Sequence, residues 1–228
     1  MSLPIAVLIS GGGSNLQALI DRIEQGTLHA RIQMVVSNVP EAKGLDRAQR
    51  HGIPHRVLSQ SDFPSREAHD LAVIHILKDC GVHLVCLAGY MRLISPEFVQ
   101  AFPSRIVNIH PSLLPSFPGL HAQGQAADFG VRLSGATVHF VDEHLDHGPI
   151  IIQAAVPANA QDDENSLSQR ILALEHRIYP QAVQWLAEDR IAIHKGKTTL
   201  HPATDQRPPA HVSPSQPCLI NPALEEGF

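Results

Sequence analysis

The sequence has few cysteines and none of the arrangements that give cysteine a structural role. Only three occur, Cys80, Cys86 and Cys218, and no two of them form a CxxC pair. Three cysteines can form at most one disulfide, and structural thiolate zinc sites usually contain CxxC pairs. The composition therefore suggests neither a disulfide framework nor a thiolate zinc site and fits a reducing compartment, so we expect a cytoplasmic location.

The chain also lacks an excess of positive charge and any long hydrophobic run. Its formal net charge is −5 and its isoelectric point is about 6.3. This balance leaves no electrostatic footprint for nucleic acid or an anionic membrane. No apolar stretch is long enough to cross a bilayer, and the start of the chain lacks the basic region of a signal peptide. We therefore expect neither a nucleic-acid partner nor a membrane partner.

Short apolar runs alternate with amphipathic helical patterns, as is typical of an α/β protein. Continuous apolar runs indicate strands that are buried on both faces of a parallel sheet, and the helical patterns between them indicate right-handed βαβ units. We therefore predict a Rossmann-like fold with a mostly parallel central sheet flanked by helices. The predicted strands are 5–9, 32–36, 56–58, 82–88, 105–110, 135–142 and 149–156.

The end of the chain differs in composition from the rest. A long helix is predicted over 166–190, and Pro180 should kink it or end it. From about Lys195 the chain is rich in Pro, His, Thr and Gln and has few large apolar residues. Since no earlier linker and no internal repeat is present, we predict one domain over 1–194 and a Pro-rich, unstructured tail over 195–228.

A glycine turn, Gly11 to Asn15, follows the first predicted strand and precedes a helix. Strand, glycine turn and helix together form a cradle for an anion, because backbone N–H groups point at the bound group. The turn has no Walker A lysine, and Leu16 replaces the last glycine of a dinucleotide fingerprint, so a dinucleotide is not expected. Ser14 and Asn15 either bind a phosphate monoester or cap the helix, and the sequence leaves both interpretations open.

Asn108 and His110 lie at the carboxyl end of a predicted strand, where open α/β sheets place their ligands. Strand alternation puts both side chains on one face, so an amide N–H and an imidazole N–H can converge on a developing oxyanion. A carboxylate from Asp146 beside His110 would stabilise the imidazolium. The structural alternatives are a hydrogen-bonded histidine at a strand end and, for Asp146, a turn residue before Gly148.

Four segments together resemble a known family. They are Gly-Gly-Gly-Ser-Asn after the first strand, Leu-Ala-Gly-Tyr-Met-Arg-Leu-Ile at 87–94, Asn-Ile-His-Pro-Ser-Leu-Leu-Pro at 108–115, and Leu-Asp-His-Gly-Pro-Ile at 145–150. The order and spacing resemble phosphoribosylglycinamide formyltransferase, the folate-dependent glycinamide ribonucleotide transformylase, over about 5–193.

This resemblance implies an activity and a catalytic trio. The family passes a formyl group from 10-formyltetrahydrofolate to the glycinamide amine of 5'-phosphoribosylglycinamide in purine biosynthesis. The trio matches Asn108, His110 and Asp146. Asn108 and His110 would stabilise the oxyanion, while Asp146 would keep His110 charged and order a proton-transferring water.

The resemblance also implies binding residues. The substrate phosphoribosylglycinamide would be bound by Gly13, Ser14 and Asn15 at its phosphate and by Glu175 at its ribose, and 10-formyltetrahydrofolate by Arg66, Met91, Arg92, Leu93, Ile94 and Asn108. Considered without the resemblance, Glu175 is typical of a solvated helix residue, Arg66 of a first helical turn, and 91–94 of ordinary packing. The chain departs from the family pattern at Gln123 and Leu172, which affects the expected loop closure and phosphate affinity.

A metal centre and two other functions are the remaining alternatives. His139, His144 and His147 are close in sequence, but no carboxylate or thiolate completes a convincing set and the resemblance implies a metal-free reaction, so we expect no metal. The same fold also serves a formyltetrahydrofolate hydrolase, which would carry a preceding regulatory domain, or a non-catalytic phosphosugar- or folate-binding protein. We expect small-molecule substrates and a monomer or homodimer.

Overall fold

The computed structural model describes residues 2–203 and 217–228, which form two compact units. The N-terminal unit contains the residues up to Asn108 together with Phe140–Glu143. The C-terminal unit contains Ile109–His139 and the chain from His144 onward. Strand β5 (Ile106–His110) therefore begins in the first unit and ends in the second.

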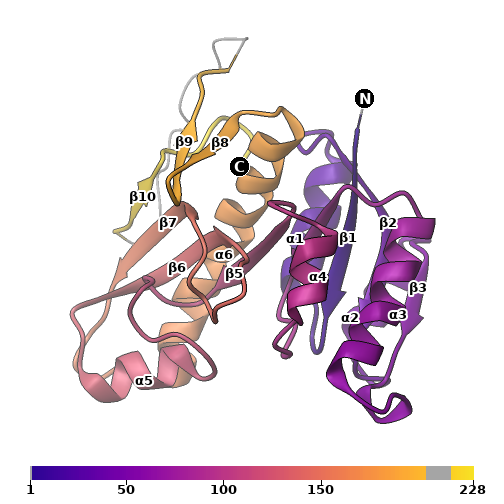
Figure 1. The fold of residues 1–228 in the computed structure, drawn as a ribbon. Helices are drawn as coiled ribbons and strands as arrows, with labels where there is room; N and C mark the ends of the chain where they lie inside the picture. Colours follow the sequence, from indigo (N-terminus) through magenta and orange to yellow (C-terminus); the bar gives the residue numbers. More distant parts are fainter. Residues whose placement is uncertain (1, 204–216) are drawn as a thin grey trace. The chain divides into compact units, whose positions relative to one another are not determined.

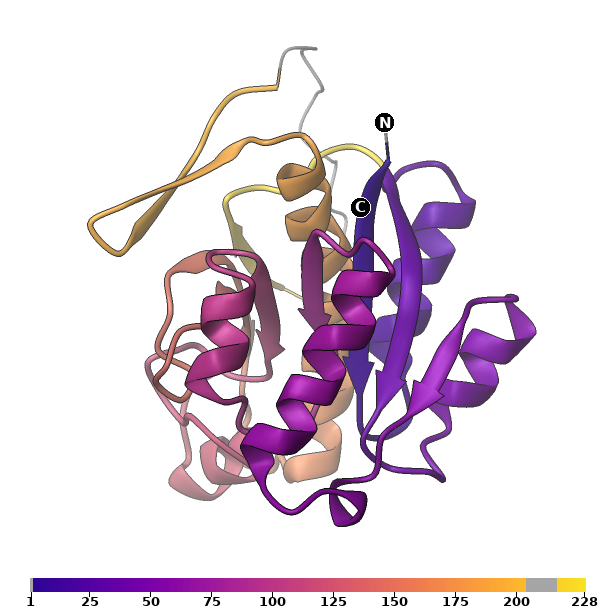
Figure 2. The same ribbon diagram turned by 45° about the vertical axis from the view of Figure 1, so that its right-hand side comes forward.

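The N-terminal unit contains five parallel strands in the order β3-β2-β1-β4-β5. Helices α1 and α2 cover one face of these strands, and α3 and α4 cover the other (Figures 1 and 2). This arrangement confirms the predicted α/β class and its parallel βαβ units. The bounds are β1 (Leu3–Ile9), α1 (Ser14–Glu24), β2 (Ala30–Ser37), α2 (Gly44–Arg50), β3 (His55–Val57), the 3-10 turn η1 (Gln60–Asp62), α3 (Arg66–Asp79), β4 (Leu84–Leu87) and α4 (Pro96–Ala101).

Apolar side chains on both faces of the central strands explain why these elements pack. Residues 5–9 of β1 are fully buried, as expected for a continuous apolar run in a parallel sheet. A core cluster joins the sheet to α3 through Leu77 and to α4 through Phe98. The hydroxyl groups of Ser65 and Ser95 cap these two helices by accepting backbone N–H bonds, which fixes where each helix begins.

The C-terminal unit is built on antiparallel strands in the order β10-β7-β6. These pairs make the sheet mixed, while the parallel pairs of the N-terminal unit keep it mostly parallel. A separate two-stranded hairpin follows the last helix. The bounds are α5 (Ala122–Phe129), β6 (Leu133–Phe140), β7 (Ile150–Pro157), α6 (Glu164–Ala187), β8 (Ile191–His194), β9 (Lys197–Leu200) and β10 (Leu219–Asn221).

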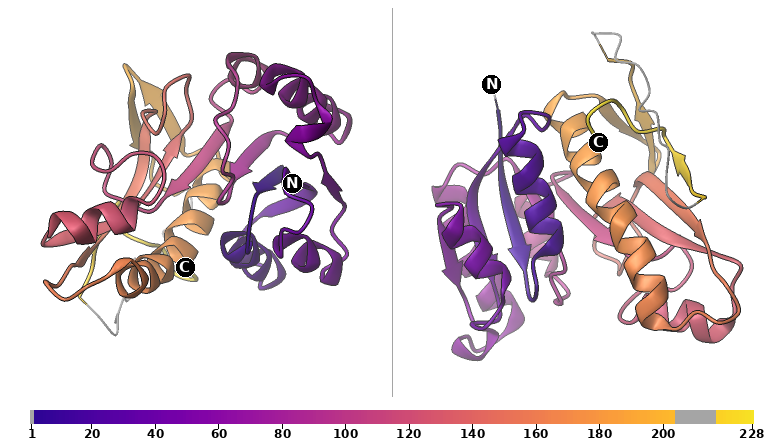
Figure 3. Two further views of the ribbon diagram at one scale, coloured as in Figure 1. Left: turned by 90° about the horizontal axis from the view of Figure 1, so that it is seen from below. Right: turned by 180° about the vertical axis from the view of Figure 1, so that it is seen from behind.

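Helix α6 packs along β7, as the rear view in Figure 3 shows. The carboxylate of Asp163 accepts the Ser166 backbone N–H while the Ser166 hydroxyl accepts the Asp163 N–H, so a capping box starts the helix. The interpretation that Pro180 ends the helix is wrong, because α6 continues to Ala187. An internal proline costs about 3 kcal/mol, and burial of neighbours such as Tyr179 and Trp185 offsets that cost. Among the described residues, no helix is both long and apolar enough to span a membrane.

The prediction of an unstructured tail over 195–228 is wrong for the part that the structure describes. Residues 204–216 lie outside the described residues. β9 and β10 are ordered strands, and β10 pairs with β7. Leu224 and Phe228 are buried, and the backbone N–H of Glu225 donates to Oε1 of Gln181 on α6 at 2.7 Å. A segment with so few apolar residues orders because it docks on a preformed surface rather than forming its own core.

An ion pair fixes the same segment. The Arg190 guanidinium lies 2.7 Å from Glu225 and 2.9 Å from Glu188. Burial alone would lower the pKa of Arg190, but these two carboxylates raise it above its ordinary value. The docked C-terminal segment is therefore part of the folded C-terminal unit.

Replacing Leu224 with alanine should lower the free energy of unfolding by about 2–5 kcal/mol, because Leu224 is 1% exposed and its removal leaves a cavity. Leu219 lies in the same segment but is 71% exposed, so Leu219→Ala should change stability by no more than about 0.5 kcal/mol. Urea denaturation of both variants measures the difference. Equal, small effects would contradict the docking of this segment.

Candidate active site

Three of the candidate segments follow neighbouring strands of the N-terminal unit. The glycine turn follows β1, residues 89–94 follow β4, and Asn108 lies near the end of β5. Two bonds hold the first two segments together: the Ser10 N–H donates to the Gly89 carbonyl at 3.1 Å, and the Met91 N–H donates to the Ser10 hydroxyl oxygen at 2.8 Å. The carboxyl ends of these parallel strands therefore form one edge, as expected for a ligand site.

The glycine turn opens α1 without a side-chain cap. Gly13 is the N-cap residue, with a left-handed φ of 68°, and no side chain makes a capping bond there. Ser14 and Asn15 are the first residues of α1, so neither occupies the N-cap position. N–H groups in the first turn of a helix have no partner within the helix, so this turn is suited to hold an anion.

Gly13 is also required by close packing. A Cβ atom at Gly13 would lie 2.6 Å from Cα of Gly44, at the start of α2. Arg47 of the same helix donates from Nε to the Gly12 carbonyl at 2.9 Å. By contrast, a Cβ atom at Gly12 would meet nothing within 4 Å. The backbone of Gly13 therefore packs closely against α2, whereas there is room for a side chain at Gly12.

Gly13→Ala should lower the free energy of unfolding by about 2 kcal/mol or more, because it adds left-handed strain to a backbone clash. Gly12→Ala is the matched control and should stay within about 1 kcal/mol of the unsubstituted protein. Thermal and urea denaturation measure both. A stable Gly13→Ala variant would contradict the close approach of α2.

The segment after β4 presents two apolar side chains outward. Met91 is 64% exposed and Leu93 is 52% exposed, whereas Ile94 is buried in the core. Burial raises the pKa of the neighbouring Tyr90 well above its ordinary value, so its hydroxyl stays neutral. Because the Ile94 side chain is buried in the core, any ligand contact by Ile94 would come from its backbone.

The two candidate arginines have different surroundings. Arg92 donates to Oε1 of Gln60 at 2.6 Å and lies 3.8 Å from Asp70, so its guanidinium is held within the N-terminal unit. Arg66 is the exposed first residue of α3 and pairs with Glu67 at 3.3 Å. Hydrogen bonds to the Glu67 backbone N–H and to Ser65 lower the pKa of Glu67, so the Arg66 partner stays ionised.

His110 ends β5 with both ring nitrogens near oxygen atoms. Nδ1 lies 3.4 Å from Oδ2 of Asp146, and Nε2 lies 2.9 Å from the carbonyl oxygen of Phe117. Both oxygens are acceptors, so each ring nitrogen lies beside an atom that can accept an N–H hydrogen bond. The His110 side chain is buried, so these contacts define its orientation.

The Asp146 carboxylate is held from three directions. Besides the pair with His110, Oδ2 accepts the backbone N–H of Gly119 at 2.8 Å, and Oδ1 lies 3.8 Å from Nε2 of His139. Its backbone is left-handed, with φ of 48°. The sequence considered His139 only as a metal ligand and missed it as a partner of Asp146; its position near the end of a strand was the available signal.

Hydrogen bonds from β6 and β7 fix the loop between His110 and Gly119. The Thr137 hydroxyl donates to the Ser112 carbonyl at 2.7 Å and accepts the Leu114 N–H at 3.1 Å. Gln153 donates to the Leu114 carbonyl at 2.9 Å. The loop that carries the Gly119 donor is therefore rigidly attached to the strands beside it.

Asn108 is partly buried and precedes His110 by two residues on β5, so strand alternation directs both side chains to the same face.

The remaining candidate positions lie on helices of the C-terminal unit. Glu175 lies on α6 and is only 6% exposed, so its interpretation as a solvated residue is wrong. Gln123 lies on α5 and Leu172 on α6, both partly buried. Of the candidate residues, the C-terminal unit brings His110 and Asp146 together, and it adds His139 as a second neighbour of Asp146.

Comparison with known proteins gives the family. Residues 3–183 match the family described as formyl transferase. Over 196 residues the chain is 45% identical to the phosphoribosylglycinamide formyltransferase of Escherichia coli, covering 86% of this chain and 92% of that protein. This chain belongs to the phosphoribosylglycinamide formyltransferase family.

A solved structure supports the family at the level of the fold. The glycinamide ribonucleotide transformylase 1 of Symbiobacterium toebii superimposes with a TM-score of 0.86 and 49% identity, covering 88% of this chain and 94% of that chain. The formyltransferase chain is also 53% identical over 184 residues, 80% of its length, to the trifunctional purine biosynthetic protein adenosine-3 of Drosophila melanogaster. It spans only 14% of that longer protein.

Proposed function

We propose that this chain transfers the formyl group of 10-formyltetrahydrofolate to the glycinamide amine of 5'-phosphoribosylglycinamide in de novo purine biosynthesis. The observation that supports it most is the buried pair of His110 and Asp146 within a member of this enzyme family. A positively charged donor fixed by a carboxylate is what a developing oxyanion needs.

The proposed reaction follows from the chemistry of these side chains. The glycinamide amine attacks the formyl carbon, a carbon–nitrogen bond forms, and the formyl oxygen takes the negative charge. N–H groups of Asn108 and His110 donate to that oxygen. The bond from the formyl carbon to N10 of the folate then breaks, while a water ordered by Asp146 carries the amine proton to N10. For Nε2 of His110 to be the donor, its bond to the Phe117 carbonyl must be exchanged for one to the substrate.

We assign the nucleotide to the glycine turn and α6. The backbone of Gly13 and the first residues of α1, Ser14 and Asn15, would bind the phosphate, since an uncapped helix start offers several N–H donors. Glu175 would accept hydrogen bonds from the ribose hydroxyls. Its burial supports a specific role rather than a solvated one.

We assign the folate to residues 91–94, after β4. The exposed side chains of Met91 and Leu93 would supply apolar surface for the pterin, while the backbone of Arg92 and Ile94 would supply its hydrogen bonds. Arg66 would pair with a carboxylate of the folate, because it is exposed at the start of α3. Asn108 would contact the formyl group itself.

We further propose the metal requirement, the partners, the location and the oligomeric state of the enzyme. The reaction as written needs no metal, because the side-chain donors neutralise the oxyanion. The substrates are small molecules, and no nucleic acid or membrane takes part. The enzyme would act in the cytoplasm as a monomer or homodimer, with residues 1–194 carrying the reaction.

Incubation with 10-formyltetrahydrofolate, with and without phosphoribosylglycinamide, tests the proposal. We expect folate release only when the nucleotide is present, in step with formylated product. Folate release without the nucleotide would indicate the hydrolase instead. Binding of both ligands without any turnover would indicate a non-catalytic binding protein.

A further inference from the structure

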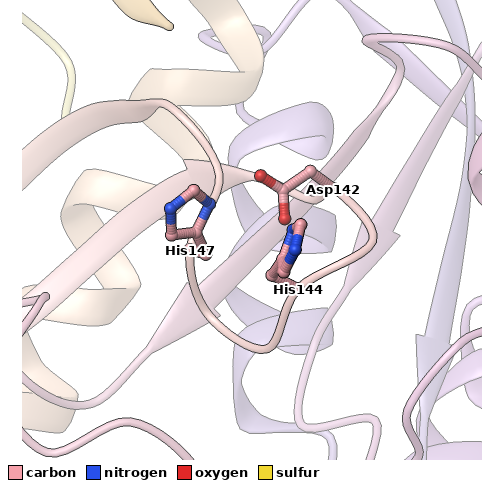
Figure 4. A group of neighbouring side chains, drawn as sticks. All are labelled: Asp142, His144 and His147. Carbon is pink, nitrogen blue, oxygen red and sulfur yellow. The ribbon is translucent and has the colours of Figure 1, made fainter.

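The loop between β6 and β7 carries three side chains with metal-ligating atoms that converge. Figure 4 shows the carboxylate of Asp142 and the imidazoles of His144 and His147 facing one region beside the loop. One ligand atom from each lies within 4.8 Å of the others. The two rings are tilted by 55°, with centroids 5.2 Å apart. Because the three residues lie within six consecutive positions, the local backbone sets their geometry.

We propose that this loop binds a divalent transition-metal ion, with zinc as the ion that its ligands fit best. Two imidazole nitrogens and one carboxylate oxygen are ligands that zinc accepts, whereas magnesium and calcium prefer oxygen ligands alone. Three protein ligands leave a fourth tetrahedral position for a water molecule.

The side chains can reach metal-binding distance without a change in the fold. Tetrahedral zinc with bonds of about 2.0–2.1 Å holds its ligand atoms about 3.4 Å apart. The present spacing of up to 4.8 Å is wider. His144 and His147 are both exposed, so rotation about their side-chain bonds closes the difference at little packing cost.

The proposed ligand set differs from the one that the sequence suggested. The sequence-based prediction of no metal grouped His144 and His147 with His139 and found no carboxylate to complete the set. In the structure His139 is buried and faces Asp146, and Asp142 supplies the missing carboxylate. The two histidines therefore have a different third partner from the one that the sequence suggested.

The site has a consequence for the proposed catalytic carboxylate. Asp146 lies between His144 and His147 in the chain, and its own oxygens are directed at Gly119, His110 and His139. A metal held by both flanking histidines would restrict the backbone that carries Asp146. This consequence rests on the proposed function, whereas metal binding itself does not.

Zinc binding by the full-length, tag-free protein tests the proposal. The metal-stripped protein is titrated with zinc against a chromophoric chelator, and cobalt(II) absorption in the visible range reports the coordination geometry. We expect one preferred site. Loss of an outer-shell partner alone weakens metal affinity about 10- to 100-fold, so His144→Ala/His147→Ala should weaken zinc binding at least about a hundredfold. Asp142→Asn should weaken it less, because both imidazoles remain.

The matched control removes two exposed histidines elsewhere, in the variant His75→Ala/His83→Ala. It has lost the same number of imidazoles and should keep the affinity and cobalt spectrum of the unsubstituted protein. Circular dichroism confirms that every variant is folded. Wild-type zinc affinity in the His144→Ala/His147→Ala variant, or equal losses in both double variants, would overturn the proposal.

Discussion

Replacing His110 with alanine should reduce kcat for formyl transfer by at least about a thousandfold, because the variant loses the proposed oxyanion donor and the partner of Asp146. The dissociation constant for phosphoribosylglycinamide should change little, since the proposed phosphate contacts lie in the glycine turn after β1. Steady-state kinetics and calorimetric titration of the nucleotide measure the two quantities separately.

The matched control for this variant is His194→Ala, which removes an exposed imidazole from β8. Its kcat should match that of the unsubstituted enzyme. If His110→Ala kept more than about a tenth of the wild-type kcat, His110 would not be the oxyanion donor. If it lost nucleotide binding and kcat together, the residue would serve the fold or the substrate site instead.

Asp146→Asn should reduce kcat by about a hundredfold to a thousandfold while the protein remains folded. The amide keeps the size of the carboxylate but removes its charge. Its single oxygen can take only one of the two carboxylate positions, Oδ2 beside Gly119 and His110 or Oδ1 beside His139, and the NH2 group takes the other. The comparison of kcat with the thermal midpoint separates the chemical effect from a structural one.

Asp128→Asn removes an exposed carboxylate from α5 and serves as the control, with kcat expected to stay at the wild-type value. An unchanged kcat in Asp146→Asn would show that charge on this residue is dispensable. Loss of folded protein would reassign Asp146 to loop structure, through its bond to Gly119.

The sequence predicted the N-terminal unit well because its signals are local. Continuous apolar runs such as residues 5–9 become buried parallel strands. The ordered C-terminal segment was not predictable in the same way. Leu224 and Phe228 form no periodic pattern, and they are buried only because α6 is already in place nearby.

In the candidate site, too, the residues in local motifs could be predicted, whereas those defined by tertiary contacts could not. His110 and Asp146 were recognisable from the order of short motifs, and the structure places them 3.4 Å apart. The role of His139 depends on which buried carboxylate its ring meets, and this is a tertiary contact. The need for glycine at position 13 likewise arises from Gly44, which is distant in sequence. Such partners are fixed by packing, and the local sequence does not identify which residue the partner will be.

Carbon-13 labelling can follow the transferred formyl carbon itself. The donor is 10-formyltetrahydrofolate labelled with carbon-13 in the formyl group, mixed with phosphoribosylglycinamide and the purified protein, and observed by carbon NMR. We expect the label to move to the glycinamide nitrogen as a formamide, with one folate released for each nucleotide formylated. Label appearing as formate, or remaining on the folate with the nucleotide bound, would contradict it.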